Sequence, residues 1–450
     1  MCRRNSDPMQ KGKRKEENTI SLETKLAQIS EKAKETPKVK FHSLAHHLSK
    51  ETLKICYGEL KKGKAAGVDG ISVEEYGKTL DANLEGLVGR MKGRKYYPQA
   101  VKRVYIPKSG NELRGLGIPA VEDKIVQMGM KKIMESIYEA DFLDVSYGFR
   151  PGRSCHMALR KVDTILMKER VNFVVDLDIH KFFDNVNQKK LVELMSRRIT
   201  DRSWISLIVR TLRSGIMEEG EIRDSKSGTP QGGVISPLLA NIYLHYALDE
   251  WYEDKFKPES RGYSGMVRYA DDVVLFFEEE EEAERFMREA KARLYRFGLE
   301  INGEKCRIIR FGRKWWRENK SGSFDFLGFT HYCDKSRAGW YKVGRKTKKR
   351  SFQKSVCELS RWLKVFRNSF KFLEIWKMMS LKMRGHFNYF GVSGNSRALN
   401  RYHNKALYLI FKWMNRRSQM RSFNWEEFHR LLKTHLLPKP RIYHSFYSLA

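Results

Sequence analysis

The 450-residue sequence lacks closely spaced cysteines: its six cysteines are scattered along the chain, and no CxxC pair occurs. This scarcity argues against a zinc knuckle and against a disulfide framework, and it fits a reducing cytoplasm. The sequence also lacks an apolar run near the ~20 residues that span a bilayer, and its N-terminus lacks a signal-peptide core. We therefore expect a soluble, cytoplasmic protein with no membrane contact.

Acidic residues are few relative to basic ones. The sequence contains 54 Asp and Glu against 87 Lys and Arg, and its formal net charge is +33. An excess of this size indicates a polyanionic partner, because basic side chains release counterions when they neutralise phosphates. The excess is concentrated in residues 336–450, where 26 lysines and arginines accompany four glutamates. Taken alone, the charge would also fit a basic structural protein of the ribosomal type.

The chain is long enough for two or three domains, and 41% hydrophobic residues can bury their cores. Residues 1–37 are charged and poor in aromatics, which predicts a mobile basic tail followed by one weak helix. Apolar residues at helical intervals predict a helix over 121–138 and another over 283–297. The same spacing in 336–450, with basic residues between the apolar ones, predicts a helical bundle with a polyanion-binding surface.

Two predicted strands in the middle of the chain end in carboxylates. Residues 266–277, MVRYADDVVLFF, predict a hairpin whose tight turn projects Asp271 and Asp272. Residues 173–177 predict an apolar strand that delivers Asp178 at its end. At about 4 Å such carboxylates repel by roughly 4 kcal/mol at an effective dielectric of about 20, so the sequence predicts bound cations. Mg²⁺ fits, because it prefers oxygen ligands and keeps sites open for substrate phosphates.

An isolated Asp-Asp pair is usually part of a structural turn, but this pair occurs together with other motifs. The chain carries, in order, DIHKFFD at 178–184, GTPQGGVISPLLANIYL at 228–244 and YADD at 269–272. From about Gly67 onward, the chain resembles reverse transcriptases encoded by bacterial group II introns. The resemblance implies that Asp178, Asp271 and Asp272 are the catalytic carboxylates and that they hold two Mg²⁺ ions.

The fold that the resemblance implies is α+β, with the right-hand architecture of a polymerase. Residues 38–165 would form the fingers and 166–335 the palm, both with an antiparallel sheet. Residues 336–450 would form an all-α thumb or maturase (X) domain. Many relatives continue into a DNA-binding and Cys/His-bearing endonuclease segment, and none is expected here.

Nucleotide-binding residues are implied by the same motifs. A hairpin over 101–119 would bring Lys108 and Arg114 to the incoming triphosphate, although a solvated charged hairpin is the alternative. Phe183 would lie beneath the sugar and leave no room for a 2′-hydroxyl, unless it is a core residue like its neighbour Phe182. The resemblance further implies that Gln231 reaches the incoming nucleotide and that Lys305 donates a proton to the leaving pyrophosphate.

Nucleic-acid contacts are expected at two places. Arg150 and Arg153 in YGFRPGR would bind the template backbone or, alternatively, form local structural pairs. Lys348, Lys349 and Arg350 end the run GRKTKKR before the first helix of the predicted thumb, where they would bind RNA or form a solvated linker. Two further carboxylates fall outside the motif positions; Asp176 is interpreted as a strand-end charge and Asp184 as a helix cap.

The expected function is RNA-templated DNA synthesis by a bacterial group II intron protein that binds its intron RNA and assists splicing and retrohoming. Its partners would be intron RNA, an RNA template with a DNA primer or target DNA, and dNTPs, in a cytoplasmic ribonucleoprotein. One alternative is a domesticated relative, such as a retron, defence or CRISPR-associated reverse transcriptase. Another is a non-catalytic RNA-binding maturase, against which the intact aspartates argue.

Overall fold

The computed structural model describes residues 21–107, 113–218, 221–223, 228, 232–417 and 423–446. The chain forms two compact units. Unit 1 comprises Met1–Asp141 and Ser196–Arg223, and unit 2 comprises Phe142–Met195 and Asp224–Ala450. The fingers were predicted to extend to residue 165, whereas the first stretch of unit 1 ends at Asp141. Unit 1 also includes Ser196–Arg223, which the sequence did not predict.

Unit 1 is mainly helical, with a small sheet of strand order β2-β1-β4-β5. Its elements are α1 (Leu22–Glu35), η1 (Ala45–His47), α2 (Lys50–Gly58), α3 (Val73–Tyr76), η2 (Gly77–Thr79), α4 (Leu80–Lys92), β1 (Val101–Pro107), β2 (Leu113–Ile118), α5 (Val121–Tyr138), α9 (Arg202–Leu212), β4 (Ile216–Glu218) and β5 (Glu221–Arg223).

Helix α5 lies at the centre of unit 1, and both α1 and α2 pack against it. Its bounds are those predicted from apolar spacing, and Ile125, Met130 and Ile133 along it are buried. The later stretch is fastened to the earlier one by Asp201, whose Oδ2 accepts hydrogen bonds from the backbone amides of Leu44 (2.7 Å) and Ala45 (3.0 Å). The other oxygen of Asp201 caps the start of α9, so one carboxylate satisfies orphan amides of two segments.

Unit 2 contains an antiparallel sheet of order β6-β7-β3-β8, a second sheet of order β11-β10-β9, and a group of C-terminal helices. Its elements are α6 (Cys155–Lys168), β3 (Phe173–Asp178), α7 (Phe182–Asn185), α8 (Gln188–Met195), α10 (Ser236–Leu244), the π-helical segments η3 (His245–Asp249) and η4 (Tyr252–Phe256), β6 (Ser264–Tyr269), β7 (Asp272–Phe277), α11 (Glu280–Arg296), β8 (Arg307–Arg310), α12 (Arg313–Arg317), β9 (Ser323–Phe326), β10 (Phe329–Lys335), β11 (Tyr341–Thr347), α13 (Lys349–Phe366), α14 (Phe372–Phe390), α15 (Ser396–Met414) and α16 (Trp425–Thr434).

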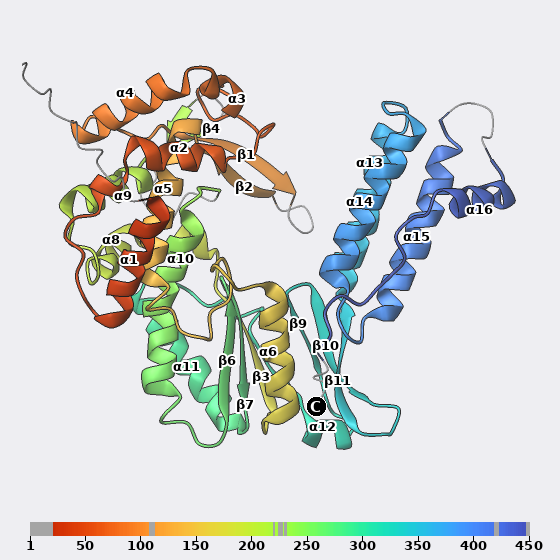
Figure 1. Cartoon of the computed structure of the whole chain (residues 1–450). Coiled ribbons are helices and arrows are strands. Elements are labelled where there is room, and N and C mark those ends of the chain that lie inside the picture. The colour runs from red at the N-terminus through yellow and green to blue at the C-terminus, as the bar shows by residue number, and fades with distance from the viewer. Residues whose placement is uncertain are drawn as a thin grey trace, which may run out of the picture. The chain divides into compact units, whose positions relative to one another are not determined.

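Both faces of the four-stranded sheet are covered. Alternate residues of β3 enter two separate cores: Val174 packs on the side of α6, whereas Val175 and Leu177 pack on the side of α11. Figure 1 shows α6 lying along strands β6 and β3. A strand that is buried on both faces is apolar at nearly every position, and for this reason FVVDLD shows little alternation.

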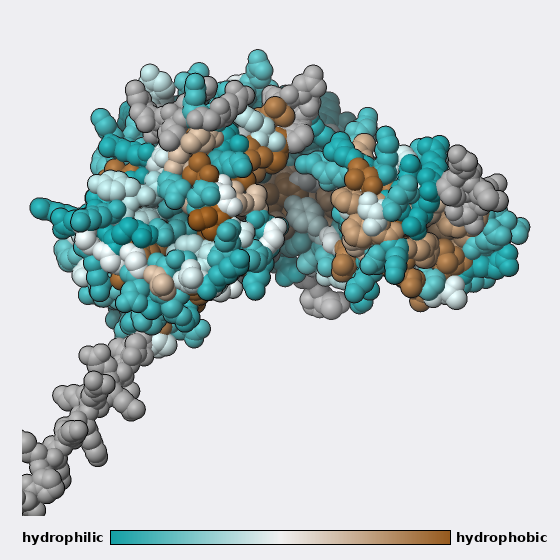
Figure 2. Space-filling view, turned by 90° about the horizontal axis from the view of Figure 1, so that it is seen from above, coloured by the Kyte–Doolittle hydropathy of each residue, from teal (hydrophilic) through white to brown (hydrophobic). Residues whose placement is uncertain are grey.

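The sequence predicted a helical domain from residue 336 onward, but the helices begin later in the structure. Residues Tyr341–Thr347 form β11, which pairs along its whole length with β10. The helices begin at Lys349, and α13, α14 and α15 pack on one another through buried Leu363, Met383 and Trp413. Hydrophilic side chains cover much of their outer surface, which lies at the right in Figure 2. Within the described parts of the chain, we find no helix that is both long and apolar enough to span a membrane.

Candidate active site

The three predicted carboxylates lie where strand β3 ends and strand β7 begins. Asp178 is the last residue of β3 and lies directly opposite Asp272, the first residue of β7. Strands β6 and β7 form the predicted hairpin, in which Tyr269 pairs with Asp272 and only Ala270 and Asp271 lie between them. Ala270 has a left-handed backbone (φ +56°), which closes the turn tightly. The turn therefore presents Asp271 beside an opposed pair of carboxylates.

The carboxylates lie close enough to oppose one another's ionisation. Burial raises the pKa of Asp272 to about 7, and the negative charges of Asp271, Asp176 and Asp178 add to this effect. Asp272 is nevertheless exposed to solvent, so it lies at the surface rather than in the core. Burial also raises the pKa of Asp176 to about 6, again with help from Asp178. Asp176 thus adds its charge to this group, and its interpretation as a strand-end charge stays a prediction.

Two lysines supply positive charge near these acids. Lys305 places its Nζ 3.6 Å from Oδ2 of Asp178. Lys348 forms an ion pair with Asp325 of β9 (Nζ to Oδ2, 3.1 Å), and its charge partly offsets the rise in the pKa of Asp176 and of Asp272. Lys348 is therefore a neighbour of the acidic site, in contrast to the linker position that the sequence left open.

Phe183 follows β3 in the short helix α7. Phe182 is 2% exposed and belongs to the core, as predicted, whereas Phe183 is only half-buried. Gly228, from the SGTPQGG motif, packs on this helix: its amide donates to the carbonyl of Val186 (2.8 Å). A Cβ at Gly228 would come within 2.8 Å of the carbonyl oxygen of Phe183, so the close approach requires glycine.

Arg150 was expected to contact the template, and the structure corrects this. Its side chain is buried, and its Nη1 donates to the carbonyls of Leu143 (2.8 Å) and Ser146 (2.9 Å). A guanidinium held in this way stabilises the loop, so the local pairing left open as the alternative is the one observed. Arg153 pairs with Asp144 (2.6 Å) but keeps 20% of its side chain exposed. A phosphate contact stays a proposal for Arg153.

The other predicted binding residues are placed as follows. Lys349 and Arg350 are exposed in the first turn of α13. Arg114 lies in β2 with its backbone opposite Ile106. Lys108 and Gln231 lie outside the described residues.

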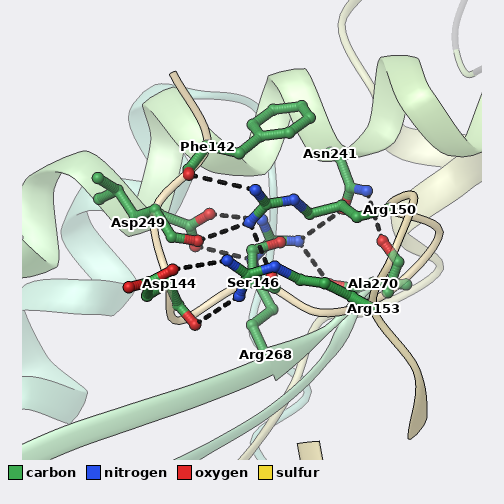
Figure 3. A network of polar contacts seen from close by, with 11 residues as sticks. Phe142, Asp144, Ser146, Arg150, Arg153, Asn241, Asp249, Arg268 and Ala270 are labelled. Carbon is green, nitrogen blue, oxygen red and sulfur yellow. Dashed lines mark hydrogen bonds and ion pairs between the residues drawn. The ribbon is translucent and has the colours of Figure 1, made fainter. Parts of the chain in front are cut away.

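Sequence reasoning missed a buried polar network beneath the YADD turn. Arg268, two residues before Ala270 in β6, is completely buried and forms an ion pair with buried Asp249 of η3. Asn241 of α10 joins them (Figure 3). The signal was an arginine within an otherwise apolar strand, MVRYADD, since a charge is seldom buried unless it is paired.

The donor set fits Mg²⁺, although no ligand cage is preformed. Among the residues that the structure describes, no three His, Cys, Asp or Glu side chains are already gathered to hold a metal ion. The carboxylates of Asp178, Asp271 and Asp272 are hard oxygen donors from adjacent backbone positions, and the charges of Asp271 and Asp178 add to the raised pKa of Asp272. A divalent cation would offset this repulsion.

Comparison with known proteins agrees with this geometry. Residues 106–331, half of the chain, match the family "Reverse transcriptase (RNA-dependent DNA polymerase)". The chain is 34% identical to the protein YkfC of Escherichia coli over 313 residues, which span 63% of this chain and 80% of YkfC. It is 32% identical to the group II intron-encoded protein LtrA of Lactococcus lactis over 300 residues, which span 64% of this chain and 50% of LtrA. The Arabidopsis thaliana mitochondrial protein "Nuclear intron maturase 4" is 27% identical over 149 residues, which span 33% of this chain and 18% of that protein. The chain therefore belongs to the reverse transcriptase family, among the proteins related to group II intron reverse transcriptases and maturases.

Proposed function

We propose that this chain is an RNA-directed DNA polymerase of a group II intron, which also binds its intron RNA and assists splicing and retrohoming. The observation that supports it best is the opposition of Asp178 and Asp272 across β3 and β7, with Asp271 in the adjoining turn. An RNA-binding protein without catalysis has no use for carboxylates that would repel RNA phosphates. In this proposal unit 1 supplies the fingers, the sheet β6-β7-β3-β8 the palm, and α13 to α16 the thumb.

Asp178, Asp271 and Asp272 would hold two Mg²⁺ ions. When bound, two such ions clamp the attacking and leaving oxygens of a phosphoryl transfer. Lys305, beside Asp178, would bring a proton donor to the leaving pyrophosphate. The half-buried ring of Phe183 would press against the sugar of the incoming nucleotide, and Gly228, which packs on the same helix, would border that nucleotide.

RNA binding is assigned to the basic surface of the C-terminal helices. Lys349 and Arg350 are exposed in the first turn of α13, and the N-cap residue Lys348 precedes them. Cations at a helix N-terminus are repelled by the positive end of the helix dipole, so these side chains do not stabilise α13. A phosphate group would reverse this balance, because it interacts favourably with the cations and with the orphan amides of the first turn.

Primer extension tests the polymerase directly. The purified chain is incubated with an RNA template, an annealed DNA primer, dNTPs and Mg²⁺, beside Asp178→Asn as the matched control of nearly equal shape. The proposal predicts template-length cDNA from the native chain and none from Asp178→Asn. A folded native chain that binds intron RNA tightly but extends no primer would instead support the non-catalytic maturase.

A further inference from the structure

The buried network beneath the catalytic turn connects three motifs that are distant in sequence. The guanidinium of Arg268 uses two nitrogens to donate to both carboxylate oxygens of Asp249, the Nε bond being 2.7 Å long. Its remaining nitrogen, Nη1, donates to Oδ1 of Asn241 (3.0 Å) and to the carbonyl oxygen of Ala270 (3.0 Å). Figure 3 shows these groups converging around Arg268.

Asn241 extends the network to the YGFRPGR segment. Its Nδ2 donates to the carbonyl of Gly148 (2.7 Å) while its Oδ1 accepts from Arg268, so the amide is bonded at both ends. Gly148 lies directly on the catalytic turn: a Cβ there would come within 2.4 Å of the backbone nitrogen of Ala270. Backbone bonds hold the same segment against β6, from Tyr147 N to Arg268 O (2.8 Å) and from Arg268 N to Val145 O (2.7 Å).

The geometry of the supporting helix matches this arrangement. Asn241 and Asp249 are eight residues apart, and in a regular α-helix they would point about 80° away from each other. The five residues from His245 to Asp249 are π-helical. A π turn contains more residues than an α turn, so each residue rotates the chain by a smaller angle about the helix axis. Both side chains therefore reach the same guanidinium. Single π turns of this kind are frequently found at functional sites.

The hydrogen bond from Arg268 to the carbonyl of Ala270 connects the network to the turn that carries Asp271 and Asp272. Ala270 adopts a left-handed conformation (φ +56°), which a residue with a Cβ keeps only where its surroundings fix it. Arg268 holds the carbonyl of this residue from below, and Gly148 contacts its amide. The next two residues are Asp271 and Asp272. The direction of both carboxylates thus depends on a peptide group that the network holds.

We propose that Arg268, Asp249 and Asn241 are positioning residues that fix the YADD turn, so that Asp271 and Asp272 are preorganised for their metal ions. This inference rests on the polymerase function proposed above and assigns these residues to it. Loss of the network would leave the fold in place but loosen the turn, and a site that is loose by about 1 Å loses much of its rate.

The test compares this network with a second buried ion pair that does not touch the turn. Asn241→Ala and Arg268→Lys are made beside Arg345→Lys, whose native guanidinium is completely buried and pairs with Asp163 of α6. All three variants should melt at lower temperature. Asn241→Ala and Arg268→Lys should also lower kcat by about 10- to 100-fold with KM for dNTP nearly unchanged, whereas Arg345→Lys should not. In the absence of nucleic acid, the first two should bind Mn²⁺ more weakly, as measured by electron paramagnetic resonance.

Equal losses of kcat and Mn²⁺ affinity in all three variants would overturn the inference, as would full activity of Asn241→Ala. A native chain that extends no primer would defeat the polymerase proposal only. Weakened Mn²⁺ binding by Asn241→Ala but not by Arg345→Lys would then still support the positioning role, and unchanged Mn²⁺ binding would reject it.

Discussion

Asp178 of β3 and Asp272 of β7 are directly opposed in one antiparallel strand pair. Opposed residues in such a pair have their Cα atoms about 4.5 to 5.5 Å apart, so the backbone itself sets the spacing of these carboxylates. Asp271 joins them from the adjoining turn. Asparagine has nearly the same shape as aspartate, so its substitution removes charge from this site and leaves the strand pair intact.

The first prediction separates catalysis from RNA binding. Changing Asp271 and Asp272 together to Asn should abolish cDNA synthesis, because the carboxylates that would hold the metal ions are removed. Affinity for intron RNA should be equal or slightly higher, since two charges that repel phosphate are gone. Primer extension and RNA filter binding measure the two effects. Weaker RNA binding by the folded variant would mean that the acidic site itself anchors the RNA.

The second prediction concerns sugar selection. Phe183→Val should admit ribonucleotides, raising their incorporation relative to dNTPs by at least about tenfold, because it frees the space that a 2′-hydroxyl requires. Single-nucleotide extension with each dNTP and NTP measures the ratio. Phe182→Leu is the matched control: its native ring is buried, so this change should lower stability without altering the ratio. Unchanged selectivity of Phe183→Val would exclude the steric role.

The third prediction follows from the raised pKa of Asp272. Its ordinary value is 3.8 and its folded value about 7, so the folded metal-free protein resists ionisation that the unfolded chain accepts. The unfolding free energy should therefore fall between about pH 4 and pH 7, and Asp272→Asn should remove part of this fall. Above about pH 7 in EDTA, the variant should be more stable than the native chain, by on the order of 1 kcal/mol after allowance for solvent screening.

Urea unfolding at several pH values measures this difference. Near pH 4 and below, the two proteins should converge, because the native carboxyl is then protonated and resembles the amide. Mg²⁺ should stabilise the native chain more than the variant at neutral pH. Parallel stability curves across the whole range would contradict the assignment of Asp272 to a crowded anionic site.

The fourth prediction addresses the N-terminus of α13. Lys349→Glu with Arg350→Glu should weaken RNA binding and reduce the log-log salt slope by about 0.7 to 0.9 for each phosphate that is no longer neutralised. Arg288→Glu with Lys291→Glu on exposed positions of α11 makes the same change in net charge and should have a smaller effect. Salt titrations of RNA affinity compare the two double variants. Equal weakening by both would mean that total charge, rather than this helix end, governs binding.

Local sequence patterns predicted the elements that carry the site. The helix over 121–138 and the hairpin within 266–277 depend on spacing that neighbouring residues impose, and the structure confirms both. The strand that ends at Asp178 was predicted from its own apolar run, and the structure confirms it. Where the chain's own periodicity decides the structure, the sequence was sufficient.

The errors arose where a distant partner decides the structure. Strand β11 reads as a basic linker, YKVGRKT, because Arg345 in it looks solvated until Asp163 is found beside it. Arg268 was overlooked in the same way, since its partner is a carboxylate from another segment. A buried arginine and an RNA-binding arginine differ only in what surrounds them, and one sequence does not display that.

Unit 1 is built from two separate stretches of chain, and this affects how the protein can be made. Strand β1 completes its sheet only by pairing with β4, whose residues Ile216 and Met217 lie opposite Val101 and Lys102. Until residue 223 leaves the ribosome, β1 keeps a bare edge whose unpaired N–H and C=O groups can recruit other strands. By then β3, with Asp178, has already been synthesised. Unit 1 can therefore close only after β3 of unit 2 has been synthesised.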